Sequence, residues 1–107
     1  MNIRDKVIKL MKEEFEVNID GERLGEEALL VYLEELDKDI VSPKVNKLLP
    51  NPVIFQTYVY QEKSEWIIGI AFKEGTDYPL YLVCLKDGKK VYEKVLTQKG
   101  IKNAKET

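Results

Sequence analysis

The spacing of apolar residues changes character near residue 52. Before this point apolar residues recur every three or four positions, and after it they alternate with polar residues or form short continuous runs. The most apolar run covers residues 66–72 and lies between two other strand-like runs. We therefore expect residues 66–72 to form the central strand of an antiparallel sheet.

The pattern before residue 52 predicts helices. Apolar residues at helical spacing predict an amphipathic helix over residues 3–15. A second helix is predicted over residues 26–38, and its apolar stripe consists of Leu29, Leu33, Leu36 and Ile40, widened by Leu30 and Tyr32. Ser42 followed by Pro43 is typical of a helix start, so a short third helix is predicted over residues 44–49.

The pattern after residue 52 predicts four strands, over residues 53–61, 65–73, 79–86 and 89–96. Asp87-Gly88 between the last two is a strong hairpin signal, because a type I′ turn needs positive φ at both central residues. We expect an α+β fold: two main N-terminal helices and a short third, then a four-stranded antiparallel β-meander with the helices packed on one face. Residues 1–97 are predicted to form a single domain, and residues 98–107 a flexible polar tail.

Two-residue turns at Lys63-Ser64 and Asp87-Gly88 would fix which side chains share a face of the sheet. The predicted core face contains Val53, Phe55, Val59, Trp66, Ile68, Ile70, Phe72, Leu80, Leu82, Cys84, Val91 and Val95. The opposite face would place four of the six tyrosines around a floor of two small residues, with Tyr58 across from Gly69. Gln56, Ile67, Val83 and Lys94 complete this face, and its predicted binding residues are Tyr58, Tyr60, Gly69, Ala71, Tyr81 and Tyr92.

This tyrosine-rich face is predicted to bind a protein or to form a homodimer, because tyrosine is enriched at interfaces. In an alternative interpretation, the tyrosines only shield the second face of a thin sheet, or a helix packs on Gly69 and Ala71.

Charge and composition narrow the function classes. The net charge is −2: residues 1–40 carry 6 basic and 12 acidic residues, and residues 41–107 carry 11 basic and 7 acidic residues. This distribution lacks the strong basic footprint of nucleic-acid binders. The absence of histidine removes the commonest general base and metal ligand, which argues against an enzyme.

The cellular location is predicted from the cysteine content and the apolar runs. Cys84 is the only cysteine, so no intramolecular disulfide can form, which suits a reducing compartment. The N-terminus lacks the profile of a signal peptide, and no apolar run reaches the roughly 20 residues that span a bilayer. We expect a cytoplasmic protein that binds neither membranes nor nucleic acid.

Residues 16–27 resemble an EF-hand calcium loop, with oxygen ligands at places 1, 3, 5 and 12 and Gly21 at place 6. Two places depart from the pattern: Glu16 replaces the usual Asp at place 1, and Arg23 stands where an apolar residue belongs. A turn between two helices is the favoured interpretation, and calcium binding is a minor alternative.

Taken together, these features predict a non-catalytic cytosolic protein-binding domain, such as an inhibitor, an immunity-type protein or an accessory protein. The main alternative is a small-molecule binder or enzyme with a pocket between helices and sheet, near Trp66 and Tyr32. The sequence nominates no catalytic residue, no metal ligand and no cofactor.

Overall fold

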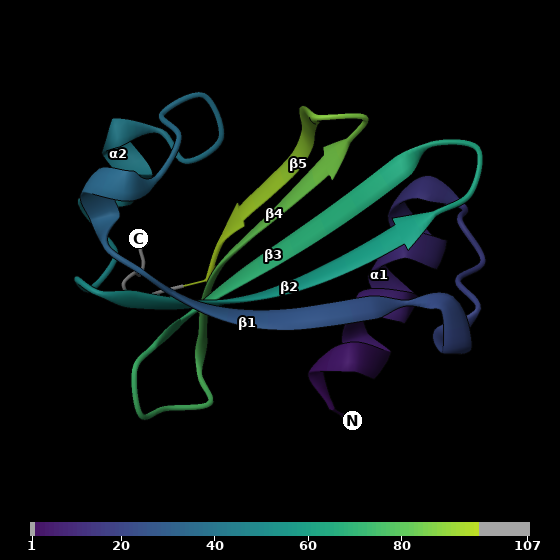
Figure 1. The fold of residues 1–107 in the computed structure, drawn as a ribbon, viewed down its shortest axis with the longest axis horizontal. Helices are drawn as coiled ribbons and strands as arrows, with labels where there is room; N and C mark the ends of the chain where they lie inside the picture. The colour runs from purple at the N-terminus through teal and green to yellow at the C-terminus, as the bar shows by residue number, and fades with distance from the viewer. Residues whose placement is uncertain (1, 97–107) are drawn as a thin grey trace.

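The computed structural model describes residues 2–96, which fold around one five-stranded antiparallel sheet (Figure 1). The strands lie in chain order: β1 (Gly25–Val31), β2 (Val53–Gln61), β3 (Glu65–Lys73), β4 (Pro79–Lys86) and β5 (Lys89–Val95). The remaining elements are helix α1 (Ile3–Phe15), the short helix α2 (Pro43–Asn46) and two 3₁₀ turns, η1 (Gly21–Arg23) and η2 (Leu33–Glu35). The two helices lie at opposite ends of the sheet (Figure 1).

Helix α1 forms where the pattern predicts it. The side chain of Asn2 caps its start by accepting a hydrogen bond from the N–H of Asp5, and the helix ends where Glu16 adopts a left-handed conformation with φ of 56°. Val7 and Met11 are buried against the sheet, as the amphipathic spacing requires.

The predicted helix over residues 26–38 is wrong. Its first part is strand β1, which pairs along its whole length with β2, and its second part is the 3₁₀ turn η2. Glu, Ala and Leu favour a helix when considered alone. The β1 pairing outweighs that preference, because without it β2 would be an edge strand with its backbone N–H and C=O groups unpaired on one side.

The sheet therefore has five strands instead of four, and the prediction that the helices share one face is also wrong. Helix α1 packs on one face, which we call the α1 face. Helix α2 and the chain before it pack on the other, which we call the α2 face. Leu33, Leu36 and Ile40 of the predicted helical stripe lie against this second cluster.

The four strands predicted after residue 52 are present, and Asp87 and Gly88 have the positive φ angles expected of their turn. The β2–β3 connection, however, has three residues, since Gln61 pairs with Glu65. A loop with an odd number of residues shifts the pairing of β2 by one residue relative to the predicted two-residue turn, and so changes which β2 side chains lie on each face. Tyr58 therefore pairs with Ile68, and Thr57 pairs with Gly69.

The shift exchanges the two faces along β2. The buried residues of the α1 face of the sheet are Tyr58, Tyr60, Trp66, Ile68, Ile70, Phe72 and Cys84, whereas those of the α2 face include Val53, Phe55, Ala71, Tyr81 and Val83. No helix among residues 2–96 is long and apolar enough to cross a membrane. The tail predicted over residues 98–107 lies outside the described residues.

Candidate functional site

The six residues predicted to form a protein-binding face do not share one exposed surface. Tyr58 and Tyr60 are 3% and 1% exposed beneath α1, and Tyr92 is half-buried with its ring edge-on to Phe15. Gly69, Ala71 and Tyr81 lie together on the α2 face, and Ala71 and Tyr81 are fully buried. Tyrosines on both faces belong to the core of the sheet, so a binding surface must be sought elsewhere.

Each helix covers only one end of its face of the sheet, and the α2 face is hollow at the end that α2 leaves open. This hollow is an apolar pocket of about 200 Å³. The sheet provides its floor with Phe55, Thr57, Ile67, Gly69, Val83 and Leu85; β1 adds Leu29 and Val31; and the chain before α2 adds Leu36, Asp37, Ile40 and Val41. We call this the β1 pocket.

Gly69 gives the β1 pocket its depth. A Cβ atom at this position would lie 3.4 Å from Cδ1 of Phe55 and 3.4 Å from Cγ1 of Val83, which is a tight approach on both sides. A larger side chain at residue 69 would therefore rise from the floor into the pocket. Thr57, directly across β2–β3 from Gly69, is half-buried and also lines the pocket.

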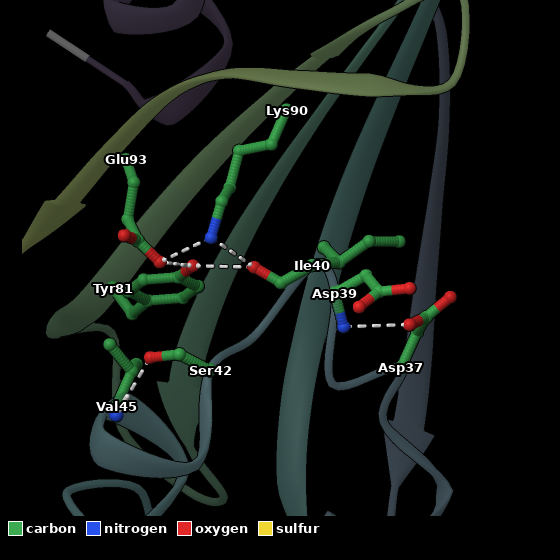
Figure 2. Close-up of polar contacts among 8 residues, drawn as sticks. All are labelled: Asp37, Asp39, Ile40, Ser42, Val45, Tyr81, Lys90 and Glu93. Atoms are coloured by element: carbon green, nitrogen blue, oxygen red, sulfur yellow. Dashed lines mark hydrogen bonds and ion pairs between the residues drawn. The ribbon is translucent and has the colours of Figure 1, made fainter.

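A compact turn forms one wall of the β1 pocket. The carboxylate of Asp37 accepts a hydrogen bond of 2.8 Å from the N–H of Asp39, as Figure 2 shows, and the Asp37 carbonyl accepts from the N–H groups of Ile40 and Val41. Side-chain-capped turns of this kind favour aspartate at the first position. The chain then enters α2, and the hydroxyl of Ser42 caps the start of this helix by accepting a hydrogen bond from the N–H of Val45.

A polar cluster ties this turn to the far edge of the sheet (Figure 2). The hydroxyl of Tyr81 on β4 donates to the carboxylate of Glu93 on β5. The ammonium group of Lys90 donates to Glu93 at 3.2 Å and to the carbonyl of Ile40 at 2.9 Å. We call these three side chains the Tyr81 cluster. It holds Ile40 of the pocket wall over the sheet.

The ionisation of the Tyr81 cluster suits a structural role. Burial raises the pKa of the Tyr81 hydroxyl, and the adjacent Glu93 raises it further, so this hydroxyl is a neutral donor at pH 7. The hydrogen bond from Tyr81 lowers the pKa of Glu93, which stays an ionised acceptor. Neither group is poised to exchange a proton near neutral pH.

Strand β1 borders the pocket and is one of the two edges of the sheet. Six of its seven residues are exposed, among them Leu29 at 44% and Leu30 at 49%. Within residues 2–96, no strand pairs with its outer edge. The other edge, β5, carries Lys89, Lys90 and Lys94, whereas the second half of β1 is apolar. Charged residues protect sheet edges from pairing with other chains, so β1 is the less protected edge.

The α1 face has a hollow of its own, a groove of about 730 Å³ at the end that α1 leaves open. Ile54, Phe72 and the buried ring of Tyr58 contribute to its lining. Arg4 pairs with Glu26 at 2.6 Å across its wall, and Gln56 donates to the same carboxylate at 3.2 Å. Burial raises the pKa of the Tyr58 hydroxyl, and the charge of Glu26 adds to the shift.

The segment that resembles a calcium loop does not lead into a second helix. Glu16 ends α1, Gly21 begins the η1 turn, and Glu27 lies in strand β1. Within the described part of the chain, no three Asp, Glu, Cys or His side chains gather closely enough to hold a metal ion.

The other residues singled out from the sequence have structural surroundings. Trp66 packs on Phe15 with the ring centroids 5.0 Å apart, whereas Tyr32 is half-exposed at the start of η2, so the two do not share a pocket wall. Cys84 is fully buried, and burial raises the pKa of its thiol to about 11. Such a thiol is inert in the folded protein.

No protein-family model matches this sequence, and comparison with curated proteins and with solved structures likewise gives no match. The site is therefore defined by its own geometry. The sequence pattern assigned Leu29 and Leu36 to a helix, placed Ile67 on the tyrosine-rich face and did not single out Thr57. The three residues Glu62-Lys63-Ser64 between the two strand patterns were the signal that could have revealed the pocket, because an odd loop places Thr57 beside Gly69.

Proposed function

We propose that this protein is a non-catalytic protein-binding domain that binds its partner at the β1 pocket and the adjoining edge of β1. The observation that carries the proposal is that an apolar pocket adjoins an exposed edge strand whose outer side pairs with no strand of residues 2–96, and that Leu29 belongs to both. An apolar side chain of a partner would fill the pocket while the partner backbone lies along the edge.

Three features support this assignment. The pocket is lined almost entirely by apolar side chains, and exposed apolar surface of this kind usually marks an interaction site. Its wall is fixed by the Tyr81 cluster, so little ordering is needed on binding. The edge strand beside it offers backbone hydrogen bonds, which supply affinity in β-strand addition.

The proposal is tested by affinity capture from an extract of the source organism, with wild-type protein and three variants as bait. Leu29→Asp places a charge in the pocket mouth, and Thr57→Phe fills the pocket with a ring. Leu30→Asp is the matched control, because Leu30 has similar exposure but pairs with Ile54 and faces the other side of the sheet.

A partner that is retained by wild-type protein and Leu30→Asp, but lost from both Leu29→Asp and Thr57→Phe, supports the proposal. A partner retained by all four proteins, or lost equally from both leucine variants, contradicts it. Circular dichroism and urea unfolding of each variant show whether loss of binding reflects loss of the fold.

A second candidate function is the binding of a small molecule in the groove of the α1 face. It is favoured by the surroundings of Tyr58, a nearly buried tyrosine lining a groove that also contains the charged side chains of Arg4 and Glu26. A thermal-shift screen of metabolites tests this candidate, since a ligand specific for the native state raises Tm. A ligand that raises Tm of the wild type but not of Tyr58→Phe would support it.

We propose a cytoplasmic location for the protein, in keeping with its single cysteine. Cys84 is unpaired and buried, which suits a compartment where thiols stay reduced. Fluorescence microscopy of a tagged protein in the source cell tests the location.

A further inference from the structure

We infer that the partner at the β1 edge is an extended, positively charged segment that adds a sixth strand to the sheet and places one apolar side chain in the β1 pocket. This inference rests on the proposed function and specifies the chemistry of the partner. It follows from the charge distribution around β1, the register of β1 on β2 and the nature of the two edges.

The surroundings of the β1 pocket are acidic. Glu27 pairs with Thr57, so its side chain projects on the same face as the pocket, and Asp37 lines the pocket itself. Glu34 and Glu35 follow in the η2 turn. Glu26 does not add to this charge, because it lies on the opposite face of the sheet and its carboxylate pairs with Arg4. A segment approaching this edge therefore meets negative charge, which attracts cationic side chains.

The register of β1 specifies a spacing. Glu27 and Leu29 are two positions apart and project on the same face, because side chains alternate along a strand. A strand added to β1 would place its own residues opposite these two, and cross-strand pairs of opposite charge or of two apolar residues are stabilising. The expected segment thus carries a Lys or Arg and a large apolar residue two positions apart.

A second copy of this chain is a poorer occupant. Pairing β1 with β1 would bring two acidic N-terminal regions together, each with a net charge of −6 over residues 1–40. Pairing β1 with the lysine-bearing β5 of another copy would bring opposite charges together, but this contact is head-to-tail and would generate closed rings or open filaments. A separate cationic segment meets the same charge requirement without assembly.

Selection of peptides tests this inference directly. Wild-type protein is used to select binders from a displayed library of random 12-residue peptides, and the enriched peptides are synthesised and titrated by fluorescence anisotropy. We expect enriched peptides to carry a basic residue two positions from a large apolar one. Raising the salt concentration should weaken their binding.

Variants of the protein distinguish the contribution of the apolar pocket to peptide binding from the contribution of charge. Leu29→Asp should weaken peptide binding by at least about tenfold although it adds negative charge, which an electrostatic contact alone would not predict. Leu30→Asp adds the same charge on the other face and should leave Kd within about twofold of the wild-type value. Glu27→Lys should weaken the same peptides by several fold, and Glu27→Gln by less.

Strand addition requires the peptide backbone. Peptides N-methylated at alternate positions in one parity should lose binding, whereas those methylated in the other parity should retain it, because only every second N–H of an added strand faces β1. If both series bind equally, the segment is not an added strand.

Three outcomes overturn the inference and leave the proposed function standing. The first is enrichment of acidic or uncharged peptides that still lose binding in Leu29→Asp. The second is capture of a cellular partner that depends on Leu29 when no peptide is enriched, which would mean that a folded surface binds here. The third is concentration-dependent association in sedimentation that is lost in Leu29→Asp, which would make a second copy the occupant. Peptides that bind Leu29→Asp and Thr57→Phe as well as wild type contradict both proposals.

Discussion

The hydroxyl of Tyr81 on β4 donates a hydrogen bond to the carboxylate of Glu93 on β5, and Lys90 connects this pair to the carbonyl of Ile40. These contacts join the C-terminal edge strand of the sheet to the turn that forms a wall of the β1 pocket. Lys90 and Ile40, which the bond connects, are 50 residues apart in the sequence. The shape of the pocket therefore depends on side chains outside it.

Tyr81→Phe removes this hydroxyl and leaves the ring in place. We expect a loss of about 1–3 kcal/mol in the free energy of unfolding, because the hydrogen bond to a charged acceptor is lost. Urea unfolding measures the change. Hydrogen exchange should quicken in residues 37–42, whose N–H groups depend on the held turn. Tyr78→Phe, at a position 77% exposed, is the control and should leave both quantities unchanged.

The same pair predicts a pH dependence. The hydrogen bond from Tyr81 lowers the pKa of folded Glu93, so the pair stabilises the protein fully above the pKa of an unfolded glutamate, about 4.3, and this contribution is lost as the pH falls through the lower folded value. Glu93→Gln should therefore be less stable than wild type at pH 7, and the difference in stability should be smaller at about pH 3.

A double-mutant cycle of Tyr81→Phe and Glu93→Gln, measured by urea unfolding at both pH values, isolates the interaction. A coupling energy that stays constant between the two pH values would contradict the assigned ionisation. The cycle also serves as its own control, since effects of either substitution on other parts of the protein cancel.

The parity of β2 is tested by two neighbouring residues. Tyr58→Ala removes a side chain that is 3% exposed beneath α1 and should cost about 3–5 kcal/mol, as for other large aromatic core residues. Val59→Ala alters a side chain that is 38% exposed and should cost about 0.5 kcal/mol. If urea unfolding ranks these two variants in the opposite order, Tyr58 is exposed and the tyrosine-rich face predicted from the sequence is correct.

Cys84 should resist modification while the protein is folded. Its thiol is fully buried, and its raised pKa of about 11 lowers the thiolate fraction at pH 8 on the order of 100-fold below that of an ordinary cysteine. A chromogenic thiol reagent should react with it only after denaturant is added. Rapid labelling of native protein, at a rate independent of denaturant, would show that the core around Met11 and Cys84 opens locally.

Elements that depend on neighbouring residues could be predicted from the sequence. Helix α1 follows from its apolar spacing, the β4–β5 turn from Asp87-Gly88, and the start of α2 from Ser42 before Pro43. The strands after residue 52 follow from their composition. Each of these signals acts within a few residues along the chain, so no knowledge of the folded partner is needed.

Strand β1 and the parity of β2 were decided by tertiary structure. Residues 26–31 contain helix-forming residues at helical spacing, and they become a strand because the edge of β2 provides hydrogen-bond partners that only exist once the sheet forms. Which side chains of β2 face each side of the sheet depends on whether the β2–β3 loop has two or three residues, and the sequence pattern is compatible with both lengths.

The consequences of those two decisions account for the candidate site. The sequence by itself determined an antiparallel hairpin array with an amphipathic N-terminal helix, because periodicity and turn chemistry are local properties. Only the tertiary structure decided that Tyr58, Tyr60 and Tyr81 enter the core and that Leu29, Thr57 and Gly69 meet around a pocket. One residue in one loop exchanges the two faces of a strand, and long-range strand pairing fixes which face is buried.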